Sequence, residues 1–146
     1  MFNNYRNLFL ALFMTFCTAA SADLAIIAHP DYDGGELDEE LVKKLFLGEL
    51  RAFPSGHQAS PANHAEGSPD RKHFFEYVLK MGESRHKRYW SRKVSTGKKG
   101  APKELNSYEE LLGWVANTPL SIAYIDKGKV DDSVKVLLTV YVFDDI

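Results

Sequence analysis

Short apolar runs with the composition of strands lie near both ends of the folded part of the sequence, and helical patterns fill the region between them. The runs at residues 24–28, 121–125 and 134–140 have the length of buried strands. Strands that are separated by helices in this way pack as one sheet with helices on its faces. We therefore predict an α/β fold with a mixed sheet, in one domain without internal repeats.

Helix signals in the intervening sequence are of two kinds, apolar residues at helical spacing and capping residues at the start. A shorter, irregular strand interrupted by Pro61 is expected at residues 58–63, and a loop rich in Gly and Lys at residues 96–103. The predicted helices are residues 37–47, a helix opening at Ser68 and Pro69, residues 84–94, and a helix opening at the capping box Ser107–Glu110.

The first 22 residues have the pattern of a signal peptide. Arg6 precedes an apolar run at residues 8–16, which is too short to cross a bilayer as a stable helix. Ala20–Ala22 provides small residues for cleavage. We predict cleavage after Ala22 and export as a periplasmic protein, with residues 23–146 forming the mature domain.

Composition excludes several classes of function for this mature domain. The full chain has 18 Lys and Arg against 20 Asp and Glu, a net charge of −2, and this balance gives no general attraction to nucleic acid. The single cysteine, Cys17, lies in the predicted signal peptide. Disulfides and thiol catalysis are therefore not expected. We predict that the protein is not an integral membrane protein.

The stretch from Asn63 to Phe75 predicts a short loop that leads directly into a helix. Gly67 allows the backbone to approach a ligand closely, and the N-terminus of the following helix offers N–H groups and a partial positive charge. Such a turn is a candidate site for phosphate, sulfate or carboxylate. The alternative is that Ser68 is only a helix cap, since Asp70 already complements the helix dipole.

A basic segment follows this region. No acidic residue lies between Glu83 and Glu104, and seven cations accumulate from Arg85 to Lys99. One interpretation is a surface that attracts anions or an acidic partner. The other is a solvated helix face whose counter-charges come from Asp38, Glu39 and Glu40. The cations are Arg85, Lys87, Arg88, Arg92, Lys93, Lys98 and Lys99.

The sequence carries no recognisable catalytic or cofactor motif. His57, His64 and His73 do not have the spacing of a standard metal site. Neither a nucleophile elbow nor a phosphate-binding P-loop is present. We predict no enzymatic activity, no metal and no cofactor.

Five segments of the sequence resemble the phosphate-binding proteins of phosphate ABC transporters. The resemblance covers residues 24–140, and the order and spacing of the segments make it more specific than any segment alone. It implies a periplasmic-binding-protein fold of type II, in which two α/β lobes close over an anion. The segments are Leu-Ala-Ile-Ile-Ala-His-Pro (24–30), Glu-Leu-Val-Lys-Lys-Leu-Phe-Leu-Gly-Glu-Leu (40–50), Glu-Gly-Ser-Pro-Asp-Arg-Lys-His-Phe-Phe (66–75), Tyr-Trp-Ser-Arg-Lys-Val-Ser-Thr-Gly-Lys (89–98) and Trp-Val-Ala-Asn-Thr-Pro-Leu-Ser-Ile-Ala-Tyr-Ile-Asp (114–126).

In that family an Arg, a Gly-Ser-Gly-Thr turn and the following helix hold phosphate. The resemblance therefore implies a ligand site made of His64, Gly67, Ser68, Asp70 and Arg71. Gly67 and Ser68 match the turn, and Arg71 matches a basic residue after it. His64 replaces the family's Arg, and Asp70 replaces a hydroxyl residue, so both differ in charge from the family pattern.

Family members also carry an additional N-terminal segment that builds much of the first lobe, so we expect about one lobe here. The first hypothesis is an exported module that binds phosphate or another small anion, with an ABC permease or an envelope protein as its partner. The second is an accessory protein of the same fold that binds no ligand and meets its partner through the basic segment.

Overall fold

The computed structural model describes residues 23–143, and the predicted signal peptide lies outside the described residues. None of the described helices is long and apolar enough to cross a membrane. The elements, in chain order, are β1 (Leu24–Ala28), α1 (Glu39–Phe46), β2 (Ser60–His64), α2 (Pro69–Phe74), the π-helical turn η1 (Phe75–Leu79), α3 (Glu83–Ser95), β3 (Lys103–Leu105), α4 (Tyr108–Asn117), β4 (Ser121–Asp126), the 3-10 turn η2 (Lys127–Lys129) and β5 (Lys135–Val140).

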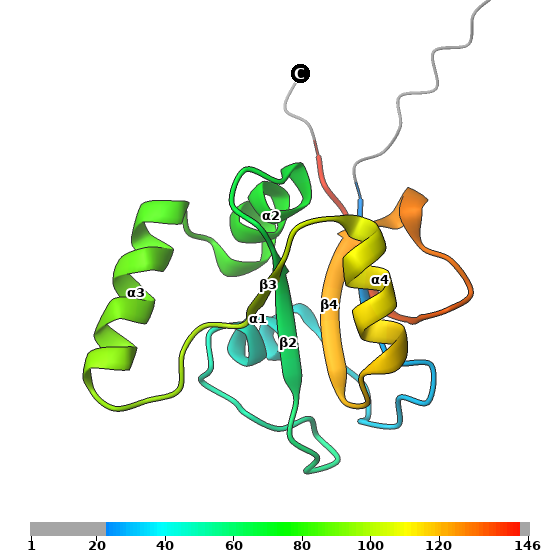
Figure 1. Ribbon diagram of the computed structural model, residues 1–146, viewed down its shortest axis with the longest axis horizontal. Coiled ribbons are helices and arrows are strands. Elements are labelled where there is room, and N and C mark those ends of the chain that lie inside the picture. The colour runs from blue at the N-terminus through cyan, green and yellow to red at the C-terminus, as the bar shows by residue number, and fades with distance from the viewer. Residues whose placement is uncertain (1–22, 144–146) are drawn as a thin grey trace, which may run out of the picture.

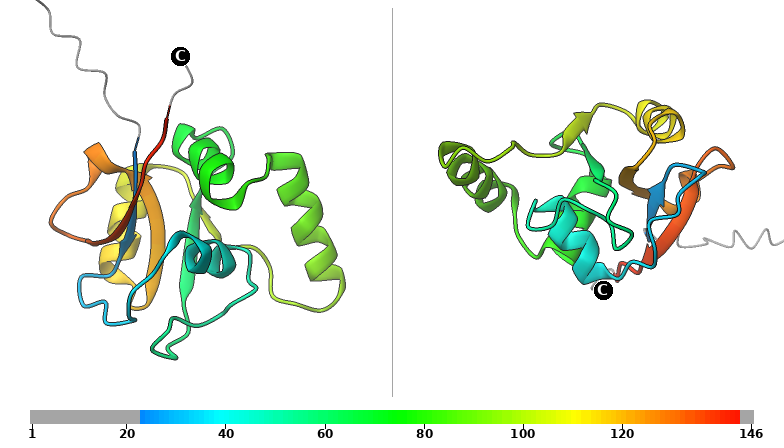
Figure 2. Two further views of the ribbon diagram at one scale, coloured as in Figure 1. Left: turned by 180° about the vertical axis from the view of Figure 1, so that it is seen from behind. Right: turned by 90° about the horizontal axis from the view of Figure 1, so that it is seen from below.

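The strands form one mixed sheet in the order β3-β2-β4-β1-β5. β2 is parallel to both β3 and β4, whereas β1 is antiparallel to both β4 and β5. Figure 1 shows α4 on one face of this sheet and α1 and α2 on the other, while α3 stands to one side. The same arrangement is visible from behind in Figure 2. The predicted fold class, an α/β sheet flanked by helices, is confirmed.

Strand predictions at the two ends of the sequence are confirmed, and the central ones are less accurate. β2 begins at Ser60 and extends to His64, with Pro61 inside it. β3 was not expected, because residues 103–105 lie at the end of a predicted loop and three residues are too few to show an alternating pattern. The strand forms because it pairs in parallel with residues 62–64 of β2.

Each predicted helix is present, with boundaries that differ by a few residues. α1 begins at Glu39 because Asp38 is its N-cap, and the Asp38 side chain accepts a hydrogen bond from Leu41 N at 2.8 Å. α4 begins after Ser107, whose Oγ accepts from Glu110 N at 3.1 Å. The cap at Ser107 was predicted from sequence, whereas Asp38 was expected within the helix that begins near residue 37.

The central helix is less regular than its sequence indicates. Ser68 occupies the N-cap position, but its side chain makes no capping hydrogen bond. After six residues α2 widens into η1, which ends at Lys80 in a left-handed conformation with φ 56°. The expected apolar stripe is nevertheless buried; its members are Phe74, Phe75, Val78 and Leu79.

Two hydrophobic clusters lie on opposite faces of the sheet. The larger is covered by α1, α2 and η1, and at its centre the rings of Phe74 and Tyr124 stack with centroids 3.8 Å apart. The smaller lies under α4 and includes Ala25, Ile27 and Val115. The sheet therefore holds α2 in place through Phe74, the last residue of the helix.

Candidate functional site

The turn between β2 and α2 is exposed and opens outward. Gly67 has φ +94°, and a Cβ added to it would meet no atom within 4 Å. The amide of Ser68 donates to Ala65 O at 3.2 Å, and Lys72 N donates to Ser68 O at 3.1 Å. The Ser68 hydroxyl is not used as a cap, so it remains available to a ligand.

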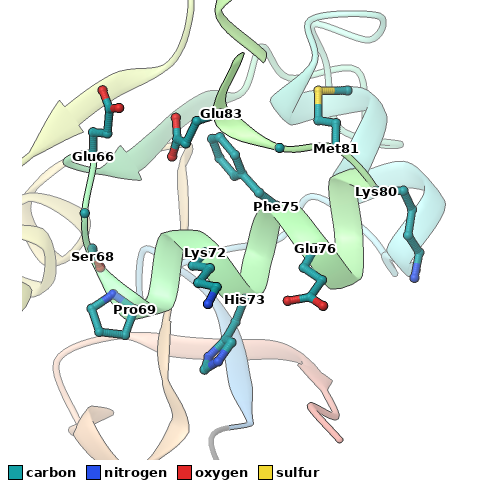
Figure 3. Close-up of a pocket in the computed structure, with 12 residues that line it drawn as sticks. Glu66, Ser68, Pro69, Lys72, His73, Phe75, Glu76, Lys80, Met81 and Glu83 are labelled. Atoms are coloured by element: carbon teal, nitrogen blue, oxygen red, sulfur yellow. The ribbon is translucent and has the colours of Figure 1, made fainter. Parts of the chain in front are cut away.

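A broad hollow of about 1020 Å³ lies in front of this turn. It is bounded by the turn, by one side of α2 and η1, and by the segment leading to α3. Figure 3 shows Phe75 projecting from the helix toward Glu83, with Ser68 at the opposite edge. The lining residues are 66–69, 72, 73, 75, 76 and 80–83. Of the five predicted ligand residues, Gly67 and Ser68 line this hollow.

Charges around the hollow are largely balanced by ion pairs. Glu83 is bound by Arg71, and Glu66 is bound by Lys87 at 3.0 Å. Two of the lining carboxylates are therefore paired with cations outside the hollow. The exposed Lys72 and Lys80 also line it, and so does the exposed Glu76. Because Arg71 also binds Glu104, the cations and carboxylates in and around the hollow are balanced.

Arg71 is buried beneath the turn and is fully engaged. Its side chain is 3% exposed, and Nε and Nη2 donate to the two carboxylate oxygens of Glu83 at 2.6 and 2.9 Å. Nη1 donates to Glu104 Oε1 and to His64 O, both at 2.8 Å. The guanidinium also lies 4.7 Å from the centroid of Phe75. These contacts raise the pKa of Arg71, so the group is a permanent cation inside the structure.

His64 and Asp70 belong to a second buried network. His64 Nε2 donates to Tyr124 O at 2.7 Å and lies 3.7 Å from Asp70 Oδ2. Asp70 Oδ2 accepts from Asp126 N at 2.9 Å, and Tyr124 Oη donates to Asn63 at 3.0 Å. Asp70 therefore ties α2 to the end of β4 and does not occupy the amides of its own helix.

Burial affects the pKa of two histidines, His64 and His86. It lowers the pKa of His64 below the usual histidine value, despite the nearby carboxylate of Asp70. Burial likewise lowers the pKa of His86, whose Nε2 accepts a hydrogen bond from Trp90 Nε1 at 3.1 Å. An indole N–H can only donate, so His86 must be neutral at this nitrogen. Burial also raises the pKa of Tyr124 far above the usual tyrosine value.

The structure thus separates the five predicted residues into two groups. Gly67 and Ser68 face the hollow, whereas His64, Asp70 and Arg71 lie beneath it and bind other parts of the chain. The partners in the buried group were missed by sequence reasoning. A signal was present for one of them, because Tyr124 is the single hydroxyl-bearing residue in the middle of an apolar strand. The sequence contains no comparable signal for the other partners, Asn63, Glu83 and Glu104.

Other predicted features can be placed as well. No group of three or more His, Cys, Asp and Glu side chains within residues 23–143 is arranged to hold a metal ion. The counter-charges expected for the basic segment are located elsewhere, since Glu40 pairs with Lys44 of its own helix at 3.7 Å. Among the cations of α3, an ion pair is found for Lys87, with Glu66.

No protein-family model matches this sequence, and no curated protein matches it. Solved structures do match. A phosphate ABC transporter substrate-binding protein with bound phosphate from Clostridium perfringens has a TM-score of 0.64 and 18% identity, over 80% of this chain and 45% of that one. An ABC-type phosphate transport receptor from Vibrio cholerae has a TM-score of 0.63 and 17% identity, and the match covers 80% of this chain and 46% of that one. PstS from Borrelia burgdorferi has a TM-score of 0.61 and 16% identity, and the match covers 81% of this chain and 48% of that one.

The chain has the fold of phosphate ABC transporter substrate-binding proteins. The resemblance seen in the sequence is therefore confirmed for the fold. This chain spans about half the length of the solved structures it matches. The likeness therefore establishes a substrate-binding-like fold over that half.

We predict that Arg71→Met destabilises the protein by about 1–3 kcal/mol, because it leaves Glu83, Glu104 and the His64 carbonyl without their donor. Urea unfolding followed by circular dichroism measures the change. Arg88→Met is the matched control, since Arg88 is exposed on α3, and its effect should stay within about 0.5 kcal/mol. Equal effects of the two substitutions would contradict a structural role for Arg71.

We also predict that the free energy of unfolding decreases between pH 7 and about 5. Folded His64 and His86 have lowered pKa values, so the unfolded chain takes up more protons as the pH falls through the usual histidine range. His86→Gln keeps an acceptor for Trp90 but does not titrate. Urea unfolding at several pH values should show a shallower pH dependence for this variant, and an unchanged dependence would exclude His86 as a contributor.

Proposed function

We propose that this chain is an exported, substrate-binding-protein-like module that binds phosphate or another small anion at the hollow in front of Gly67 and Ser68. It acts in the periplasm, after removal of the signal peptide, and presents its ligand to the permease of an ABC transporter. It performs no chemistry on the ligand and needs no cofactor.

The observation that carries this proposal is the open turn at the start of α2. Its backbone is exposed at Gly67, its Ser68 hydroxyl is not used as a cap, and the exposed Lys72 lies on the same hollow. Backbone N–H groups, a hydroxyl and an ammonium are the donors that an oxyanion needs. The neighbours of this fold include a protein with bound phosphate, which supports the choice of anion.

His64, Asp70 and Arg71 act in this proposal as positioning residues. Arg71 holds the β2 end of the turn through the His64 carbonyl, and Asp70 holds α2 against β4. Because the hollow is open to solvent, its hydrogen bonds to an anion compete with water and contribute less than buried ones. We therefore expect weak binding, with a dissociation constant on the order of millimolar.

Isothermal titration calorimetry with inorganic phosphate tests this proposal. We expect Lys72→Ala to weaken binding roughly two- to fivefold, as for an exposed charge. Ser68→Ala should also weaken it, because a donor is lost. Lys44→Ala, on α1 and outside the hollow, is the matched control and should bind as the wild type does. Absence of heat at millimolar phosphate, or equal binding by all four proteins, would reject the site.

A second function, docking to an acidic partner protein, is favoured by α3. Three exposed arginines on this helix line a hollow of about 540 Å³, whose lining residues include no carboxylate. The helix is fixed in place because Tyr89 Oη and Lys93 Nζ both donate to Leu47 O, at 2.6 and 2.8 Å. The arginines are Arg85, Arg88 and Arg92.

We predict that replacing these three arginines with serine abolishes capture of an acidic protein from periplasmic extract, whereas phosphate binding is unchanged. Replacing Lys98 and Lys99 with serine, in the loop after α3, serves as the control for a general loss of charge and should retain capture. Capture that is equal for both variants, or that is insensitive to salt, would contradict this docking surface.

A further inference from the structure

The hollow in front of the Gly67–Ser68 turn is much larger than an inorganic anion needs. Its volume of about 1020 Å³ is comparable with that of sites that enclose an organic molecule, which have roughly 300–1,000 Å³. Figure 3 shows Ser68 at one end of the lining and Met81 at the other. An oxyanion held by Ser68 and Lys72 therefore fills one end and leaves the remaining space open to another part of the ligand.

This remaining space has an apolar wall. Apolar atoms form most of the surface of the hollow, and they come chiefly from Pro69, Phe75 and Met81. Figure 3 shows Phe75 and Met81 on the same side of the helix. Met81 is half-buried, and a methionine side chain adapts its shape readily to an apolar ligand.

The end of η1 holds this wall in place. Lys80 has φ 56°, in the left-handed region, and there the chain turns back so that Met81 N donates to Phe75 O at 3.1 Å. The ring of Phe75 is fixed in turn by the Arg71 guanidinium, which lies 4.7 Å from its centroid. An apolar surface that is already ordered loses little conformational entropy when a ligand covers it.

Charge alone gives an anion little advantage in this hollow. Lys72 and Lys80 lie four residues to either side of Glu76, and all three side chains are exposed and line the hollow. The carboxylate between the two lysines reduces their attraction for an anion and opposes a second anionic group on the same ligand. Apolar area that leaves water contributes to binding whatever the charge balance.

We propose that the ligand of this hollow is an organic anion, with a single phosphoryl or carboxylate group attached to an apolar body. This inference rests on the proposed function, since the anionic group takes the end of the hollow formed by Ser68 and Lys72. The apolar body lies along the wall formed by Phe75 and Met81. Inorganic phosphate occupies the first of these positions and leaves the second unused.

Calorimetry with phenyl phosphate, inorganic phosphate and phenol tests the class of ligand. Phenyl phosphate should bind at least about tenfold more tightly than inorganic phosphate, because its ring leaves water. Phenol has the ring without the phosphoryl group and should bind at least about tenfold more weakly than phenyl phosphate. Lys72→Ala should weaken the binding of phenyl phosphate, because the anionic group loses a cation.

Met81→Gln tests the apolar wall, since glutamine has a similar length and a polar end. The preference for phenyl phosphate, measured as the ratio of the two dissociation constants, should fall at least about threefold. Met81→Leu is the conservative variant and should keep the preference. Val94→Gln replaces an apolar residue that is 53% exposed on α3, outside the hollow, and should also keep it. Circular dichroism establishes that the variants are folded.

The outcomes separate this inference from the proposed function. Phosphate binding without a preference for phenyl phosphate would overturn the inference and leave the proposed function standing. An equal preference in Met81→Gln and Val94→Gln would do the same. Equal binding of phenol and phenyl phosphate, unchanged by Lys72→Ala, would show a purely apolar site and reject the anion site as well. Absence of heat with all three compounds would overturn both.

Discussion

The buried guanidinium of Arg71 connects more parts of this structure than any other side chain described above. It binds the end of β2 through a carbonyl, the first turn of α3 through Glu83 and the β3 edge through Glu104. α3 stands apart from the sheet, so few apolar contacts fix its first turn (Figure 1). A forked, permanently charged donor can hold three acceptors in fixed directions, which an apolar side chain cannot do. This one group therefore fixes the first turn of α3, while Tyr89 and Lys93 hold the later part of the helix through the Leu47 carbonyl.

The same interaction explains why the candidate site differs from what the sequence indicates. Arg71 follows the Gly67–Ser68 turn directly, so it seemed suited to hold an anion. The structure turns its side chain inward, where two carboxylates distant in sequence satisfy it. His64 and Asp70 are likewise directed toward β4. Backbone, a hydroxyl and an exposed lysine consequently face the hollow, and for this reason the anion binding that we propose is weak and shallow.

Much of the fold was predictable because its signals are local. The strand β1 is uniformly apolar, and the capping box at Ser107 marks the start of α4. β3 could not be predicted, because its three residues form a strand only through their pairing with β2. For the site, the position of the turn was predictable from Gly67 and Ser68. The inward direction of Arg71 was not, because Glu83 and Glu104 become its partners only after the chain has folded.

The π-helical turn η1 carries a consequence for how this helix can vary among related chains. A turn of this kind holds one more residue than an α-helical turn, and here it forms the last turn of the helix, which ends at Lys80. Phe74 can therefore stack on Tyr124 while the next residue, Phe75, packs against Arg71 and His86. Deletion of a single residue here would restore a regular α-helix and leave the preceding turn, with its Gly67 and Ser68, in place. Chains one residue shorter at this point are thus the length variants that the architecture accommodates with least rearrangement.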